Sequence, residues 1–317
     1  MTGSRVRIWK QDPTVEPIRQ RPTFISSQVD AGPSDSRIRI RNMPQVFPDL
    51  KGDFLLERDA NPDQFDAVHH LKALEFWFFD HEGHRVFTCR SFDIVAHEMG
   101  HAILDSIRPG YLTSTHPQTG GLHEAFGDLS AIFTMLAQLD QCEAIVAESR
   151  LNLHDRSFFN VVGEQFGQAL GREHGLRNAD NDLKLSDVGT SVHALSQVFT
   201  GGVYDSLADM FDDHLDLDRY DPAETLFRVG QHMASVLLVA LLNAPDKDAS
   251  YADIVNKMIE IEPVAEWKEF IRSNFEKREV LGPIGFAPAT QLVSELDLGG
   301  CCGTLSSEEY RKELDSN

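Results

Sequence analysis

The sequence predicts an α+β fold that is predominantly helical, and three observations carry this prediction. The strand-like runs that we recognise, RIRIRN and RVFTC, both lie before residue 90. Beyond residue 120, nearly every segment repeats its apolar residues at helical spacing. Hydrophobic residues make up 41% of the 317-residue chain, which is enough for a sizeable core. We expect an arm with short strands (1–62), a reduced N-terminal part (63–110), a helical C-terminal domain (111–282) and a tail (283–317).

The N-terminal elements are predicted to be short strands and one helix. RIRIRN (37–42) alternates Ile with Arg, as a strand does. From Asn61 to Gly83 a capping signal is followed by apolar residues at helical spacing, so we expect a helix there. RVFTC (85–89) is predicted to be a short strand.

The remaining elements are predicted to be helices. One begins at a cap on Ser91 or Asp93 and ends near Ile107, before RPGY. The next follows the break at Gly120 and Gly121. Four more are indicated by apolar periodicity, at residues 191–211, 223–242, 250–260 and 264–280.

The composition disfavours nucleic acid and membranes as partners. The formal net charge is −21, so a phosphate backbone or an anionic membrane would repel the chain. MASVLLVALL (233–242), the longest apolar run, is about half as long as a membrane span, and we recognise no signal segment. Four cysteines without a C-x-x-C pair fit a reducing compartment. We therefore expect a cytoplasmic protein, with secretion by a non-standard route left open.

The segment HEMGH (97–101) is the strongest chemical signal in the chain. Residues four apart share one face of a helix, so His97 and His101 can present ring nitrogens to a single ion. Glu98 projects from the adjacent side, where a carboxylate could take a proton from water polarised by zinc. The alternative is two solvated histidines, but the apolar flanks DIVA and AIL favour a histidine face directed into a cleft.

A catalytic zinc site of this kind needs a third protein ligand. In GGLHEAFGD (120–128), Glu124 and Asp128 are four apart and share one helix face. One carboxylate could bind the metal while the other accepts the second ring N–H of a histidine ligand. The metzincin pattern is excluded, because Leu104 and Ile107 stand where that class has Gly and His.

Together, DIVAHEMGHAILD and GGLHEAFGD resemble the thermolysin-like neutral metallopeptidases, the gluzincins. That family combines H-E-x-x-H with a later glutamate in a G-x-x-x-E-A-x-x-D context. The resemblance implies a thermolysin-like zincin with a reduced β part, a central zinc-binding helix and a helical C-terminal domain. It also implies one zinc ion on His97, His101 and Glu124, with Glu98 as general base and Asp128 orienting His97.

The same resemblance implies further catalytic residues. DVGTSVHALSQVF is similar to the family segment whose histidine faces the developing oxyanion, here His193, and Asp187 would hold its ring. Tyr111 lies close to where the family keeps a tyrosine that assists this histidine.

Substrate-binding residues are also implied by the resemblance. GLRNADN is similar to the family's arginine segment, so Arg177 would grip a substrate backbone carbonyl. The alternative for Arg177 is an exposed arginine in a polar loop. Ile94 and Leu176 would line the primed-side pocket, which implies cleavage before a bulky apolar residue.

The chain departs from the family at its calcium and edge-strand positions. Asp93 and Glu164 match two calcium-ligand positions, but Met135 stands where a third is expected, so a full double Ca²⁺ site is not predicted. The family's long β-rich segment, with its substrate-pairing asparagine, is replaced by DHEGHRVFTCRS.

The sequence thus predicts a zinc-dependent endopeptidase acting on a peptide or protein substrate. The alternative keeps the zinc but gives it a latent or non-proteolytic role, as a small-amide hydrolase or as a binding module closed by the tail. An inactive structural protein is disfavoured, because Glu98 and His193 serve chemistry rather than zinc binding.

Overall fold

The computed structural model describes residues 91–112, 114–162, 175 and 177–282, together with the backbone of six short strands that precede them. Most of the described residues are helical, and the strands are few and short, which confirms a predominantly helical α+β class. The tail and most of residues 1–72 lie outside the described residues, so the proposed domain boundaries stay a prediction.

The described strands pair two by two. Three of the pairs are antiparallel and one, β3 with β4, is parallel. The predicted strands RIRIRN and RVFTC are present as β3 and, shifted by one residue at its start, β6. The bounds are β1 Ser4–Ile8, β2 Arg21–Ile25, β3 Arg39–Asn42, β4 Ala73–Phe76, β5 Phe78–His81, β6 His84–Phe87, β7 Val161–Val162 and β8 Arg177–Asn178.

The helix predicted from Asn61 to Gly83 is wrong over its second half. Residues 73–76 and 78–81 are strands β4 and β5, and the first half lies outside the described residues. The sequence there, ALEFWFFDH, is dense in aromatic residues, which fit a pleated surface well. A short run with so many apolar residues matches the helical period and a strand equally, so spacing alone could not decide.

The other six predicted helices are all present, and the described residues add two helices that we did not predict, α2 and α4. The same part of the chain also contains short 3₁₀ turns at Phe158–Asn160 and Leu185–Asp187. The helices are α1 Phe92–Ile107, α2 Pro109–Leu112, α3 Pro117–Leu136, α4 Leu139–Ser149, α6 Val192–His214, α7 Pro222–Asn243, α8 Tyr251–Ile261 and α9 Ala265–Lys277.

Helix α3 begins earlier than predicted, because Gly120 and Gly121 do not break it. Pro117 lies in its first turn, where a missing backbone N–H costs nothing. Gly121 lies inside the helix, and a Cβ there would collide with the Tyr251 hydroxyl of α8 and with Leu195 of α6. The glycine therefore serves close packing between helices rather than a turn.

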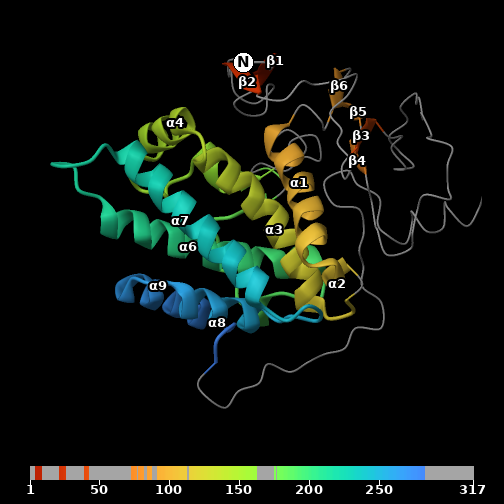
Figure 1. Cartoon of the computed structure of the whole chain (residues 1–317), viewed down its shortest axis with the longest axis vertical. Coiled ribbons are helices and arrows are strands. Elements are labelled where there is room, and N and C mark those ends of the chain that lie inside the picture. Colours follow the sequence, from red (N-terminus) through yellow and green to blue (C-terminus); the bar gives the residue numbers. More distant parts are fainter. Residues whose placement is uncertain are drawn as a thin grey trace, which may run out of the picture.

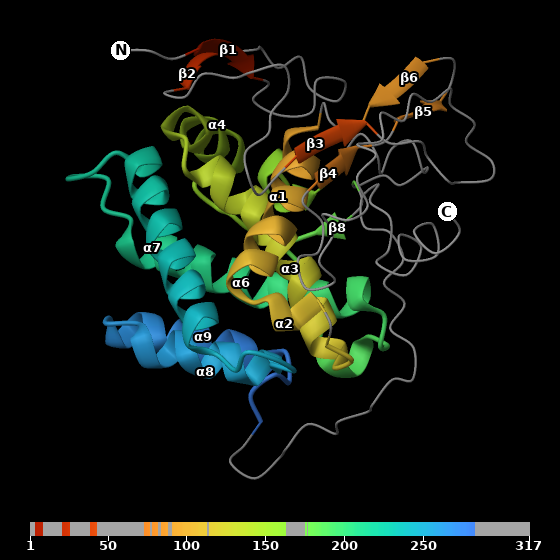
Figure 2. The ribbon, with the colours of Figure 1, turned by 45° about the vertical axis from the view of Figure 1, so that its right-hand side comes forward.

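Helix α3 is the centre of the described helical region. It packs chiefly against α1 on one side and α6 on the other, while α7 packs against α4 and α8, and α6 against α9 (Figure 1). Helices α8 and α9 lie together at one end of this assembly (Figure 2). The core between the helices is large and apolar, and its bulkiest fully buried side chains include Phe159, Phe199, Tyr204, Phe211, Tyr251 and Phe275.

Helix α7 is the one single helix of the described residues that is both long and apolar enough to span a membrane. By length and composition it could cross a membrane, and the bent pair formed by α3 and α4 passes the same test together. Half of the apolar stretch of α7 is buried inside the protein, as in the core helix of a folded domain. The expected cytoplasmic location and the absence of membrane and nucleic-acid partners stay predictions.

Candidate metal centre

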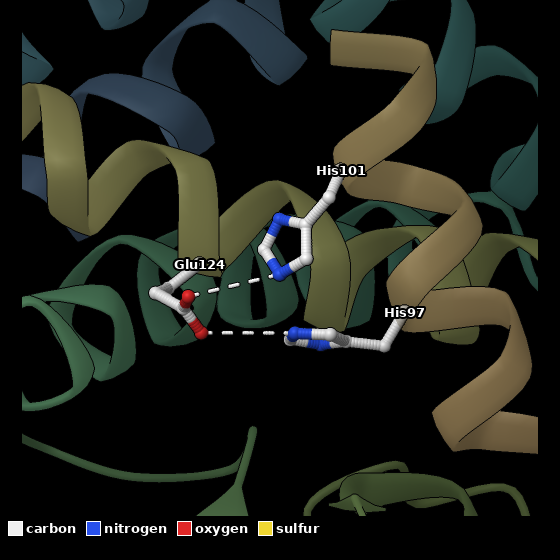
Figure 3. Close-up of side chains that lie close together, drawn as sticks. All are labelled: His97, His101 and Glu124. Atoms are coloured by element: carbon white, nitrogen blue, oxygen red, sulfur yellow. Dashed lines mark ion pairs between the residues drawn. The ribbon is translucent and has the colours of Figure 1, made fainter. Parts of the chain in front are cut away.

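Three potential metal ligands converge between α1 and α3. His97 and His101 come from α1 and Glu124 from α3, and their ligand atoms all lie within 4.8 Å of one another. Figure 3 shows both rings and the carboxylate pointing toward one another from the two helices. Nε2 of His97 and Nε2 of His101 are each 3.6 Å from an oxygen of Glu124.

The spacing and the donor set fit a zinc ion. Ligands arranged tetrahedrally at about 2.0–2.1 Å from zinc lie roughly 3.4 Å from one another. Nε2 of each histidine is 3.6 Å from one oxygen of Glu124, close to that separation, and two imidazoles with one carboxylate form a donor set that catalytic zinc sites use. The geometry establishes a group that could hold a metal, while the identity of the metal stays a prediction.

Helix geometry accounts for the arrangement of the two histidines. Their four-residue separation places both rings on the face of α1 that meets α3, with centroids 4.6 Å apart and planes nearly perpendicular. His97 is fully buried, and the side chain of His101 is 13% exposed. A Cβ on Gly127 would lie 2.6 Å from Cε1 of His97, so α3 approaches this ring closely because residue 127 is glycine.

The ring of His97 is supported by Asp128, as predicted. Nδ1 of His97 lies 2.8 Å from Oδ1 of Asp128, which leaves Nε2 directed at Glu124. Arg177 in turn donates two hydrogen bonds to the same carboxylate, Nε to Oδ2 at 2.7 Å and Nη2 to Oδ1 at 2.8 Å. Burial would raise the pKa of Asp128, but the guanidinium of Arg177 and the hydrogen bond from His97 hold it below its usual range.

The ring of His101 is supported by two residues that sequence reasoning missed. Nδ1 of His123 lies 2.7 Å from Nδ1 of His101, and Nε2 of His123 lies 2.8 Å from Oδ1 of Asp105. The rings of His101 and His123 also stack, with centroids 4.6 Å apart. Two signals in the sequence could have found them: Asp105 follows His101 by four residues, and His123 directly precedes Glu124.

Electrostatics place the ligands in forms that bind a cation. Burial lowers the pKa of His101 well below its ordinary value, so its ring is neutral near pH 7. Burial would raise the pKa of Glu124, but the neighbouring histidines hold it well below the usual range. A neutral imidazole and an ionised carboxylate are the ligand forms that metals require.

Of two further predicted catalytic residues, His193 contacts the ligand group and Glu98 is buried next to His97 in sequence. Glu98 follows His97 on α1 and is 1% exposed. His193 lies in the first turn of α6, and its Nδ1 is 3.2 Å from Oε2 of Glu124. Its side chain is 34% exposed, so this ring borders both the ligand group and solvent.

The structure places two other predicted residues elsewhere. The carboxylate of Asp187 is exposed and accepts a hydrogen bond from the backbone N–H of Lys184 at 3.0 Å, so the described contacts do not show it supporting His193. The hydroxyl of Tyr111 donates to the carbonyl oxygen of Pro245 at 2.9 Å, and burial raises its pKa to about 12. Their proposed catalytic roles stay predictions.

The residues proposed for the substrate pocket and for calcium are mostly buried or outside the described residues. Ile94 is 1% exposed, and Leu176 and Glu164 lie outside the described residues. Asp93 is buried and accepts hydrogen bonds from Ser91 and from the backbone of Ile94. Met135 belongs to the hydrophobic core, and the expectation about calcium stays a prediction.

A second group could hold a metal by proximity alone. It consists of His154, Asp180 and Asp205, which lie at the surface. Asp205 already forms an ion pair with Arg278 at 2.7 Å, so one carboxylate of this group is neutralised by the protein itself. The same guanidinium donates to Asn181 and to the carbonyl oxygen of Leu183 in the loop after β8.

Comparison with known proteins adds no family to these observations. No protein-family model matches the sequence, and a search of curated proteins finds no significant match. The resemblance to thermolysin-like peptidases therefore rests on the sequence motifs and stays a prediction.

Proposed function

We propose that this protein is a zinc-dependent endopeptidase of thermolysin-like design. The observation that carries the proposal is the convergence of His97, His101 and Glu124, whose ligand atoms lie within 4.8 Å of one another, with each Nε2 3.6 Å from an oxygen of Glu124. Each histidine directs Nε2 at Glu124 while its Nδ1 contacts a supporting side chain. That division of the two ring nitrogens is characteristic of metal-ligating histidines.

The remaining residues of the centre would perform the proton chemistry. A zinc ion, when bound, supplies Lewis-acid polarisation of water and of a peptide carbonyl. Glu98 would accept the proton of the attacking water and pass it to the leaving amine nitrogen. His193 would donate a hydrogen bond to the oxygen that gains negative charge.

Two supporting residues would hold this arrangement in place. Asp128 keeps the ring of His97 in the tautomer whose Nε2 faces the ligand group. Arg177 holds Asp128 through two N–H groups, and it remains our candidate for contacting a backbone carbonyl of the substrate. A contact with the substrate carbonyl would use other N–H groups of this guanidinium, which has five N–H groups in all.

A comparison of the wild type with Glu98→Gln tests the proposal. We expect both proteins to bind one zinc ion, since Glu98 is not a ligand, and we expect cleavage of casein and of a quenched peptide library to fall by about 10²–10⁴-fold. Glu260→Gln, which alters an exposed carboxylate on α8, is the matched control and should retain full activity.

The other outcomes separate the alternatives. Zinc binding without cleavage by the wild type would contradict the peptidase and favour the latent or non-proteolytic role. Deleting residues 283–317 then distinguishes those two, because a latent enzyme should gain activity. Absence of zinc from protein purified without chelator would contradict both.

Substrate preference is a separate part of the proposal. If Ile94 and Leu176 line the pocket, peptides should be cut before bulky apolar residues, because such a pocket favours apolar side chains. Sequencing the fragments of the peptide library measures this preference. Cleavage chiefly before charged residues would exclude these two residues as its determinants.

A further inference from the structure

The two ligand histidines are supported by different kinds of partner. Behind His97 stands a carboxylate, Asp128, held by the guanidinium of Arg177. Behind His101 stands a second imidazole, His123, and behind that the carboxylate of Asp105. The second arrangement is a chain of two short hydrogen bonds that begins and ends on α1 and passes through one residue of α3.

The hydrogen bonds of this chain permit one arrangement of protons that agrees with metal binding. Nε2 of His101 faces Glu124, so when it acts as a ligand its lone pair is used there and its proton lies on Nδ1. Nδ1 of His123 must then accept that proton's hydrogen bond. The proton of the neutral His123 ring consequently lies on Nε2 and is donated to Asp105.

We propose that His123 and Asp105 are positioning residues that fix the tautomer and orientation of His101 and thereby set the affinity of the centre for zinc. This inference rests on the metal centre of the proposed function. The side chains of His123 and Asp105 are only 13% and 17% exposed, so water competes little for their hydrogen bonds. The stacked ring of His123 also restricts rotation of His101.

Three substitutions test the hydrogen-bond chain that runs from His101 through His123 to Asp105. His123→Phe keeps an aromatic ring but removes the acceptor for His101. Asp105→Asn keeps the volume but removes the charge that holds the proton on Nε2 of His123. His123→Asn restores an amide acceptor close to the position of Nδ1 and should recover much of the affinity that His123→Phe loses.

Zinc affinity is the first measurement, made on the full-length chain by competition with a chelator. We expect the dissociation constant for zinc to rise by about 10–100-fold in His123→Phe and by less in Asp105→Asn. Asp180→Asn is the matched control, because it removes the carboxylate of another His–Asp pair with the same 2.8 Å separation, outside the centre. Its zinc affinity should equal that of the wild type.

Histidine nitrogen chemical shifts provide the second measurement. In zinc-loaded Glu98→Gln protein, long-range proton–nitrogen spectra should show His101 protonated on Nδ1 and His123 protonated on Nε2. A residue with a merely structural role would not dictate this pair of tautomers. Because Glu98→Gln retains the ligands, both measurements are independent of peptidase activity.

The outcomes of the two experiments are distinguishable. An affinity of His123→Phe within about twofold of the wild type, or the opposite tautomer on His123, would overturn the positioning role. If His123→Phe does not fold, Asp105→Asn and the tautomers carry the test. If the wild type binds zinc but cleaves nothing, and His123→Phe loses zinc affinity, the proposed peptidase function would be contradicted and the positioning role supported. A wild type that binds no zinc would overturn both.

Discussion

Among the described residues, two groups of histidine and carboxylate side chains could hold a metal by proximity, and they differ in how the protein surrounds them. In the group on α1 and α3 the three side chains are between 0% and 13% exposed. In the group of His154, Asp180 and Asp205 the exposures are 45%, 24% and 19%. The first group is enclosed between helices, whereas the second borders solvent.

The use of the ring nitrogens separates the groups further. Nδ1 of His97 contacts Asp128, so Nε2 is left to face the third ligand. Nδ1 of His154 instead contacts Asp180, which is itself a member of its group. Asp205 is paired with Arg278, whose positive charge opposes a cation. Residue types and distances therefore do not define a metal site without the direction of each ring and the local charge.

The largest expected effect comes from removing one histidine from each group. His97→Ala should weaken zinc binding by more than about 100-fold, which exceeds the usual effect of losing a supporting residue. His154→Ala should leave one zinc bound per chain with unchanged affinity. Elemental analysis after dialysis against a chelator measures both. Loss of zinc from His154→Ala together with retention of zinc by His97→Ala would contradict the assignment of the zinc site to the group on α1 and α3.

A smaller effect is expected from filling the space beside His97. Gly127→Ala places a methyl group against the imidazole ring, so α1 and α3 must move apart. We expect a loss of about 1–3 kcal/mol in the free energy of unfolding, together with weaker zinc binding. Urea unfolding and chelator competition measure the two effects.

Gly189→Ala is the control for this substitution. Nothing lies within 4 Å of a Cβ at residue 189, so the added methyl group meets open space. Stability and zinc affinity should both stay at the wild-type level. Equal behaviour of the two alanine variants would contradict the close contact between α3 and His97.

The smallest expected effect concerns the surface pair of His154 and Asp180. Burial alone would lower the pKa of His154, but the hydrogen bond and charge of Asp180 outweigh it and raise the pKa above 6.5. A raised folded-state pKa means that the folded protein holds the proton more tightly than the unfolded chain does. The pair therefore stabilises the fold fully below pH 6.5, and this stabilisation is lost as the pH rises through the raised pKa.

Asp180→Asn tests this pH dependence of stability. At pH 5.5 its free energy of unfolding should be lower than that of the wild type by less than about 1 kcal/mol, because an exposed pair contributes little. The difference should vanish at alkaline pH, where His154 is neutral in both proteins. Urea unfolding across this pH range, in the presence of a chelator, measures it. A difference that grows with pH would contradict the assigned ion pair.

The ligand group could be predicted from the sequence because its geometry is local. Four-residue spacing on one helix fixes His97 relative to His101, and the same spacing links Glu124 to Asp128. Residue spacing along a helix does not predict which faces of α1 and α3 pack against each other. The contact of His123 with His101 depends on that packing, which is why we missed it although both residues lay in the motifs.

The errors in the fold have the same origin. The apolar run from residue 73 to 81 was compatible with a helix or with strands, and apolar spacing alone does not show that β4 pairs with the distant β3 and β5 with the adjacent β6. Gly121 suggested a break in α3, but its role is to admit Tyr251 of α8, 130 residues further along the chain. Asp187, which we expected to hold the ring of His193, accepts a hydrogen bond from Lys184 at a local 3₁₀ turn, and its support of His193 stays a prediction.

The contacts of Arg278 have a consequence for the order in which the centre is completed during synthesis. This residue anchors the loop around Asn181, which follows directly on the strand that carries Arg177. A ribosome makes the loop 97 residues before Arg278, so the hydrogen bonds from Arg278 form only after α9 has emerged, whereas the bond from Asn181 to Gln197 of α6 can form earlier. We therefore expect the contact of Arg177 with Asp128 to be fixed late, so that the nascent chain completes the centre only when its helical region is nearly finished.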